Sequence, residues 1–185
     1  TGDNMKIFAT DFDGTLRMND GISEDNIKAI EKFRSEGNLF GVVTGRDYTN
    51  GYKIFKRNND FPFDFLILSN GANAYDFDGN ELFSFRTDSK ASIDGKNLAT
   101  VLMEKSFEVK VEYCGLYDGE KRYIFCPDLP DGGAYENVIC SPLSVLCDID
   151  SFISGFAVFT DDTESAQAVP LFLSSYGEHI EAMQN

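Results

Sequence analysis

Three short apolar segments stand out in the N-terminal part of the chain. Residues 6–10 predict a short buried strand that leads directly into Asp11. Leu39–Val43 and Phe63–Leu68 predict two further strands, each built mostly of apolar side chains. Runs of this length fit strands in the interior of a parallel sheet.

Polar segments with helical periodicity separate these strands. Apolar side chains recur at helical spacing over Glu24–Glu36, with Ser23 as the candidate N-cap and Gly37 as the residue that ends the helix. A weaker helical pattern covers Asn50–Arg57. The apolar stripe of the first helix consists of Ile27, Ile30 and Phe33.

Alternation of strand and helix with short connections predicts a parallel sheet with crossover helices. In such sheets functional groups gather beyond the carboxyl ends of the strands. The three predicted strands end in polar, glycine-containing turns: Asp11 to Gly14, Thr44 to Arg46, and Ser69 to Gly71. The sequence therefore predicts a site where these turns meet.

After Gly71 the pattern becomes a mixture of short strands and helices, which indicates an α+β module. A hairpin over Ala74–Phe85 turns at Asp78 to Asn80 and is followed by a helix carrying Leu98, Val101 and Leu102 on one face. A loop is expected over Pro127–Gly133, and a helix capped by Thr163 after the last long strand. The expected strands of this part are Phe107–Tyr113, Arg122–Cys126, Gly155–Thr160 and His179–Met183.

Charge changes which ligands are plausible. The 185 residues include 16 Lys and Arg against 31 Asp and Glu, for a formal net charge of −15. Such a chain repels nucleic-acid backbones and anionic lipid surfaces, so we expect no nucleic-acid partner and no membrane binding. A phosphorylated metabolite remains compatible with this charge if a divalent cation and a few local donors reverse the field at the site.

The cysteine and histidine content narrows the chemistry further. The four cysteines form no C-x-x-C pair, and we expect them to be free thiols. A single histidine, His179, argues against multi-histidine zinc sites and against a histidine-based triad. The N-terminus shows no apolar run of signal-peptide type, and we expect a cytoplasmic protein.

Carboxylates are therefore the expected chemical groups. Asp11 and Asp13 alternate along an extended segment, and Gly14 lets the chain turn so that backbone N–H groups approach a ligand. Two carboxylates this close stay ionised most easily beside a cation such as Mg²⁺, which makes both residues candidate metal ligands. Asp11 would attack phosphorus as a nucleophile, and Asp13 would act as general acid and base.

The next strand end supplies groups for a phosphate. Thr44 offers a hydroxyl, Gly45 lies among backbone N–H groups suited to a phosphate oxygen, and Arg46 offers a charge-assisted contact. Thr44 alone is also consistent with a capping role, Arg46 with a solvated surface, and Asn70 with a left-handed turn.

At these residues the chain resembles a known family. D-F-D-G-T-L after the first strand and V-V-T-G-R after the second resemble the haloacid dehalogenase (HAD) superfamily of phosphohydrolases. S-N-G-A after the third strand, with an α+β module behind it, resembles the Cof-like branch, in which a large cap is inserted at this point. The resemblance implies an α/β, Rossmann-like parallel-sheet core over residues 5–72 and an α+β cap over residues 73–185.

The resemblance also implies roles for individual residues. Asp11 is then the nucleophile and a Mg²⁺ ligand, and Asp13 is the acid/base that binds Mg²⁺ through its carbonyl. Thr44 binds the phosphoryl group, with Arg46 and Asn70 near the substrate. The implied reaction is phosphate removal from a small metabolite, with a sugar phosphate as the default, through an aspartyl-phosphate.

The chain departs from the family pattern in its C-terminal part. The family carries a lysine and an acidic, glycine-containing turn after the cap, and neither is found here. Asp161 and Asp162 are the only substitutes for the acidic turn, and a solvated loop explains them better. We therefore expect that a missing C-terminal segment or a partner completes the core. The alternative to a phosphatase is an incomplete or non-catalytic module that binds a phosphorylated ligand or a partner chain.

Overall fold

The structure, a computed structural model, describes residues 5–18, 21–52, 55–56, 61–103, 111–126, 134–135 and 138–159. The chain divides into two compact units, Thr1–Phe85 and Arg86–Asn185, and each is described by itself.

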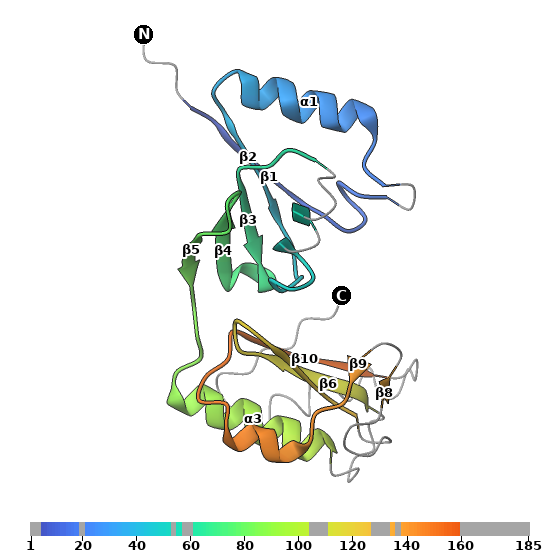
Figure 1. The fold of residues 1–185 in the computed structure, drawn as a ribbon, viewed down its shortest axis with the longest axis vertical. Helices are drawn as coiled ribbons and strands as arrows, with labels where there is room; N and C mark the ends of the chain where they lie inside the picture. Colours follow the sequence, from blue (N-terminus) through green and yellow to red (C-terminus); the bar gives the residue numbers. More distant parts are fainter. Residues whose placement is uncertain are drawn as a thin grey trace. The chain divides into compact units, whose positions relative to one another are not determined.

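The first unit is built on a mixed five-stranded sheet with the strand order β1-β2-β3-β4-β5 (Figure 1). The first three strands pair in parallel, and the last two add an antiparallel hairpin. The three apolar runs expected to form parallel strands do so, and the α/β, Rossmann-like fold class is confirmed. The strands are β1 (Ile7–Asp11), β2 (Leu39–Val43), β3 (Phe65–Leu68), β4 (Asn73–Asp76) and β5 (Glu81–Ser84).

Helix α1 (Glu24–Ser35) is the crossover between β1 and β2, and Figure 1 shows it lying along the sheet. The side chain of Ser23 accepts a hydrogen bond from the Asn26 N–H at 3.2 Å, which confirms the expected N-cap. Gly37 follows the helix with φ 82°, and its N–H donates to the Arg34 carbonyl at 2.9 Å. Helices commonly end at a residue with a left-handed backbone conformation, which glycine adopts without a steric cost.

An ion pair ties the end of α1 to the sheet. Arg34 donates to both carboxylate oxygens of Asp64, from Nε at 2.9 Å and from Nη2 at 2.7 Å. Asp64 also accepts the backbone N–H of Phe40 at 2.8 Å. Burial alone would raise the pKa of Asp64, but these donors hold it below its usual range.

The core of the first unit lies on the sheet and is rich in aromatic rings. Phe12, Phe55 and Phe61 pack with ring centroids 4.4 to 5.8 Å apart. Its fully buried members include Phe40, Val42, Phe55, Phe63, Leu66 and Leu68.

Strand β1 differs from the expectation of a buried strand. Ile7 is 63% exposed and Phe8 56% exposed. The physical reason is the strand order: within the part of the chain that the structure describes, β1 pairs only with β2 and forms the edge of the sheet.

The hairpin after Gly71 belongs to the first unit. Strands β4 and β5 extend the sheet beyond β3, and the Phe85 N–H donates to the Ala72 carbonyl at 2.7 Å. The sequence-based boundary after residue 72 falls inside this sheet, whereas the two compact units divide between Phe85 and Arg86. Alternation alone predicted the hairpin but could not say which sheet it would join.

The second unit combines helix α3 (Ser89–Met103) with a three-stranded antiparallel sheet in the order β10-β6-β7. Its core joins Ala99 and Leu102 of the helix to Leu116 and Phe125 of the sheet. The remaining elements are β6 (Val111–Tyr117), β7 (Arg122–Phe125), β8 (Ala134–Tyr135), β9 (Val138–Ile139), the 3-10 turn η2 (Leu143–Cys147) and β10 (Ser154–Phe159).

The strand expected over Phe107–Tyr113 continues to residue 117 in β6, where Cys114, Leu116 and Tyr117 are buried in the sheet, and residues 107–110 lie outside the described residues. The loop over Pro127–Gly133, the helix after Thr163 and the strand His179–Met183 lie outside the described residues.

The expectation of four free thiols is wrong for two of the cysteines. Cys126 and Cys140 form a disulfide, whereas Cys114 and Cys147 are free. No spacing motif marks the pair, because the two cysteines are brought together by the fold rather than by proximity along the chain. Burial raises the pKa of the Cys114 thiol to about 12, so this thiol is chemically quiet.

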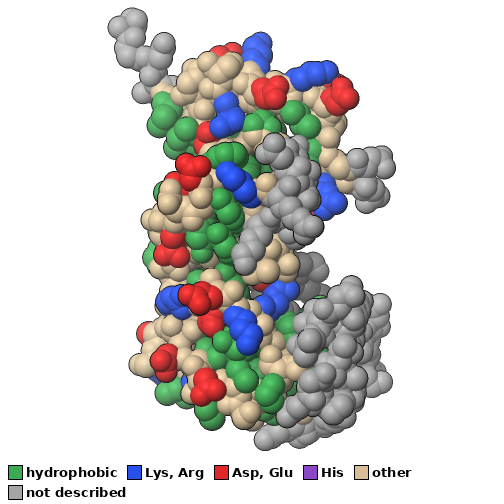
Figure 2. Space-filling view, viewed as in Figure 1, with side chains coloured by type: hydrophobic (Ala, Val, Ile, Leu, Met, Phe, Trp, Pro, Cys, Tyr) green, Lys and Arg blue, Asp and Glu red, His purple; other side chains and the backbone are tan. Residues whose placement is uncertain are grey.

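On the face drawn in Figure 2, Lys and Arg side chains are interspersed with Asp and Glu. Among the described residues, no helix is long and apolar enough to cross a membrane.

Candidate active site

The register of the sheet brings the polar turns together at one edge. Asp11, the last residue of β1, lies opposite Val43 of β2, and Val43 lies opposite Ile67 of β3. The Thr44 N–H then donates to the Ile67 carbonyl at 2.9 Å, which places the second turn against the end of the third strand. The three strands are parallel, so all three turns emerge at their carboxyl ends.

The turn after β1 orients Asp11. The hydroxyl of Thr15 donates to Asp11 Oδ2 at 2.9 Å, and the Leu16 N–H donates to the Asp11 carbonyl at 3.2 Å. Gly14 has φ 78°, which allows the chain to turn between the two aspartates and Thr15. Thr15 holds one carboxylate oxygen of Asp11. Asp11 is exposed, and its carboxylate therefore remains accessible to solvent.

Asp13 is held by Arg46. The guanidinium donates from Nε and from Nη2 to the two carboxylate oxygens, each at 2.8 Å. This bidentate pair joins the first turn to the second. The hydrogen bond from Arg46 lowers the pKa of Asp13 below its usual range, and burial opposes the shift.

Thr44 is only 5% exposed, and its hydroxyl oxygen accepts the Arg46 N–H at 3.3 Å. Because the hydroxyl acts as acceptor in that bond, its own hydrogen can be donated elsewhere. Thr44 thus places a buried hydroxyl at the end of β2.

The third turn is locked to the second by backbone hydrogen bonds. The Ser69 N–H donates to the Arg46 carbonyl at 2.9 Å, and the Asn70 N–H donates to the Thr44 carbonyl at 3.2 Å. Ser69 and Asn70 have φ 52° and 55°, and Gly71 has φ 98°. Left-handed conformations at two successive non-glycine residues are unfavourable in isolation, so these bonds to the second turn hold them in place.

Gly45 lies where the second and third turns pack closely against each other. A Cβ at this position would come within 2.8 Å of Asn70 Oδ1, so a side chain there would push Asn70 aside. The second and third turns therefore pack closely because one of them carries a glycine.

The oxygen atoms at this edge fit part of a magnesium site. Mg²⁺ is usually held in proteins by one or two carboxylates, with waters and substrate phosphates completing an octahedron. Asp11 offers an exposed carboxylate, while both oxygens of the Asp13 side chain are engaged by Arg46. A metal contact through the Asp13 main-chain carbonyl stays a prediction. Among the described residues, no three acidic, cysteine or histidine side chains gather to hold a metal ion.

Every site residue expected from the sequence, namely Asp11, Asp13, Thr44, Gly45, Arg46 and Asn70, lies in these three turns. Sequence reasoning missed Thr15, whose position four residues after Asp11 in the turn was the available signal. It also missed Ser69, which is buried and left-handed, and whose hydroxyl has no hydrogen-bond partner among the described residues. Asp161 and Asp162 lie outside the described residues.

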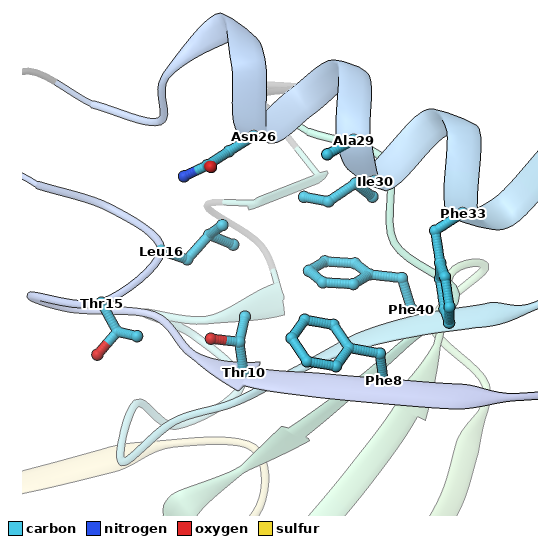
Figure 3. Close-up of a pocket in the computed structure, with 9 residues that line it drawn as sticks. All are labelled: Phe8, Thr10, Thr15, Leu16, Asn26, Ala29, Ile30, Phe33 and Phe40. Carbon is cyan, nitrogen blue, oxygen red and sulfur yellow. The ribbon is translucent and has the colours of Figure 1, made fainter.

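A hollow of about 450 Å³ lies beside this edge, between α1 and strands β1 and β2. Figure 3 shows Phe8 and Phe40 of the sheet facing Ile30 and Phe33 of α1, with Thr15 at the opposite end of the hollow from Phe33. The lining is mainly aromatic and aliphatic, unlike the polar turns.

The fold is of the α/β class, with three polar turns at the carboxyl ends of its parallel strands, and the comparisons with known proteins identify its family. The family model of haloacid dehalogenase-like hydrolases matches residues 8–128, well over half of the 185 residues. The chain belongs to this family. A comparison with the curated proteins found no match.

Several solved structures share the fold. TM0651 of Thermotoga maritima aligns with TM-score 0.64 and 18% identity over 93% of this chain and 62% of that protein. The phosphatase BT1666 of Bacteroides thetaiotaomicron aligns with TM-score 0.59 and 18% identity over 92% of this chain and 61% of that protein. The HAD subclass IIB sugar phosphatase BT4131 aligns with TM-score 0.58 and 20% identity over 80% of this chain and 56% of that protein.

These similarities establish the fold. The chain spans less than two thirds of the length of each of these three proteins.

Proposed function

We propose that this chain carries the nucleophile and the acid/base of a Mg²⁺-dependent phosphohydrolase that acts on a small phosphorylated metabolite. The observation that carries the proposal is the Asp11 carboxylate, fixed by Thr15 at the edge where the Thr44 hydroxyl and the Arg46 guanidinium also lie. Family membership supports hydrolase chemistry in general.

The proposed reaction has two steps. A carboxylate oxygen of Asp11 forms a bond to phosphorus while the bond from phosphorus to the leaving oxygen breaks, and Asp13 gives that oxygen a proton. Water then attacks the aspartyl-phosphate, Asp13 takes the proton from this water, and the bond between Asp11 and phosphorus breaks to release phosphate. Thr44 donates a hydrogen bond to the phosphoryl oxygens in both steps.

Mg²⁺, held by the Asp11 carboxylate and the Asp13 carbonyl, would neutralise phosphate charge when bound. A sugar phosphate is the proposed substrate class; support comes from one protein of the same fold, the sugar phosphatase BT4131. A cytoplasmic location stays a prediction.

The test is turnover of p-nitrophenyl phosphate with and without Mg²⁺. Asp11→Asn should lower kcat by about a thousandfold or more, because it removes the nucleophile. Asp25→Asn is the matched control, since Asp25 is an exposed acid in the first turn of α1. Equal losses in the two variants, or activity that persists in Asp11→Asn, would refute the assigned role.

A second candidate function is favoured by the exposed edge of the sheet. We propose that a further polypeptide segment, of the kind that makes the relatives longer, pairs with the side of β1 on which the described residues place no strand, and covers Phe8. Without it this chain would act as an incomplete module that binds a phosphorylated ligand but turns over slowly. Steady turnover by the 185-residue chain at about 1 s⁻¹ or faster, within the ordinary range of enzymes, would rule this candidate out.

A further inference from the structure

The guanidinium of Arg46 is fixed from several directions. Besides its two bonds to Asp13, it donates from Nη1 to the Asn50 carbonyl at 3.2 Å. Its central carbon lies 5.3 Å from the ring centroid of Phe12 and 5.9 Å from that of Phe55, both buried in the core. Arg46 is therefore anchored by groups that belong to the interior of the first unit.

Asp13 is the freer partner of this pair. Its side chain is 52% exposed, against 24% for the Arg46 side chain. It follows Phe12 in a turn that Gly14 continues, whereas Arg46 has contacts on two aromatic faces and a carbonyl. If the pair opens, Asp13 is the side chain that moves.

The closed pair conflicts with the chemistry of the proposed function. Arg46 donates to both carboxylate oxygens of Asp13, an arrangement that favours the ionised carboxylate, whereas a general acid must carry a proton. Asp13 must leave Arg46 before it can transfer a proton. The guanidinium fork would then offer two N–H donors, and a planar fork of this kind suits the oxygens of a phosphoryl group as well as those of a carboxylate.

We propose that Arg46 is an exchange site, at which a phosphate group displaces the Asp13 carboxylate and thereby frees Asp13 for its acid/base role. This inference rests on the proposed function and deepens it, because the binding of substrate itself releases the acid/base residue Asp13 from Arg46. Arg46 is then a phosphate ligand and a positioning residue for Asp13, and the two roles alternate.

The exchange predicts how the affinity for phosphate depends on Asp13 and Arg46. Because the carboxylate and the phosphate compete for one guanidinium, removing the carboxylate must tighten phosphate binding, and the gain must depend on Arg46. Loss of a nearby negative charge would also tighten binding in a general way, but that gain would not need Arg46.

The experiment is a double-mutant cycle on the equilibrium binding of inorganic phosphate. The dissociation constant is measured by titration calorimetry for the unmodified protein, Asp13→Asn, Arg46→Gln and the double variant, at one fixed Mg²⁺ concentration and again without Mg²⁺. Asp13→Asn should tighten binding about five- to tenfold when Arg46 is present, and less than about twofold in the Arg46→Gln background. Circular dichroism verifies that each variant folds, and Arg46→Lys, which keeps the charge without the fork, replaces Arg46→Gln if the latter does not fold.

Arg17→Gln is the matched control. Arg17 is a second cation near Asp13, and its guanidinium carbon lies 6.0 Å from the Phe12 ring, but the Asp13 carboxylate is bonded to Arg46. The gain from Asp13→Asn should persist in this background.

An equal gain from Asp13→Asn with Arg46 intact and in the Arg46→Gln background would overturn the exchange, and so would an absence of phosphate binding in every variant. Turnover of p-nitrophenyl phosphate separates the two proposals. Turnover without coupling leaves the phosphatase standing and removes the exchange, whereas coupling without turnover leaves the anion site and removes the phosphatase.

Discussion

Residues in each of the three turns are held in place by bonds to residues of another turn. The pair of Asp13 and Arg46 spans 33 positions of sequence, and Ser69 and Asn70 keep their left-handed backbone through bonds to the second turn. At this scale the motif spacing predicted which residues lie in the turns, because the strands before them are short and regular. It could not predict which of them bond to one another, since that depends on the sheet register.

Thr15 supplies a test at this scale. Thr15→Val removes the hydroxyl that donates to Asp11 Oδ2 and should lower kcat by roughly ten- to a hundredfold, because a hydrogen bond to a charged group contributes about 1.5–3 kcal/mol. Steady-state turnover of p-nitrophenyl phosphate measures the effect. Thr15→Ser keeps the hydroxyl and should retain most of the activity; a Val variant as active as the Ser variant would mean that Asp11 needs no such partner.

At the scale of elements, α1 and the three parallel strands β1, β2 and β3 were predicted from periodicity, capping and apolar runs, and they are present. The failures have one cause in common. The burial of β1, the sheet joined by the hairpin and the point where β6 ends all depend on the strands that lie beside each strand, and periodicity along one strand does not identify its neighbours.

The tie between α1 and the sheet gives a prediction for stability. Asp64→Asn should lower the free energy of unfolding by about 1–3 kcal/mol, since Asp64 accepts two bonds from Arg34 and one from Phe40. Urea unfolding at neutral pH measures the loss. The control is Glu24→Gln, which removes an exposed i,i+4 pair with Lys28 and should change little.

The same pair sets a pH dependence. The folded-state pKa of Asp64 lies below its unfolded value, so its contribution is complete above the unfolded pKa of about 4 and is lost as the pH falls through the folded pKa. The difference in stability between the unmodified protein and Asp64→Asn should therefore be constant near neutral pH and shrink below about pH 4. A difference that grew towards acid pH would contradict this assignment.

At the scale of the whole molecule, we expect association in solution to involve the edge of the first sheet at β1, beside which no described strand lies. Unpaired strand edges with apolar side chains favour association between chains. Phe8→Lys should therefore reduce concentration-dependent association, measured by light scattering or sedimentation. Met18→Lys is the control, since Met18 is 62% exposed but lies outside β1, and it should leave association unchanged. Equal effects of the two substitutions would point to general charge repulsion instead.

The number of strands in the β4–β5 hairpin determines the end of the sheet at which the chain leaves it. Strand β5 is antiparallel to β4, which is antiparallel to β3, so β5 again runs in the direction of β1. An even number of added strands therefore returns the chain to the edge that carries Asp11 and Thr44, and the segment that follows Phe85 starts there. An odd number would deliver it to the opposite end of the sheet. One added hairpin at this joint would thus keep the start of the following segment at the same end of the sheet, whereas one added strand would move that start to the other end.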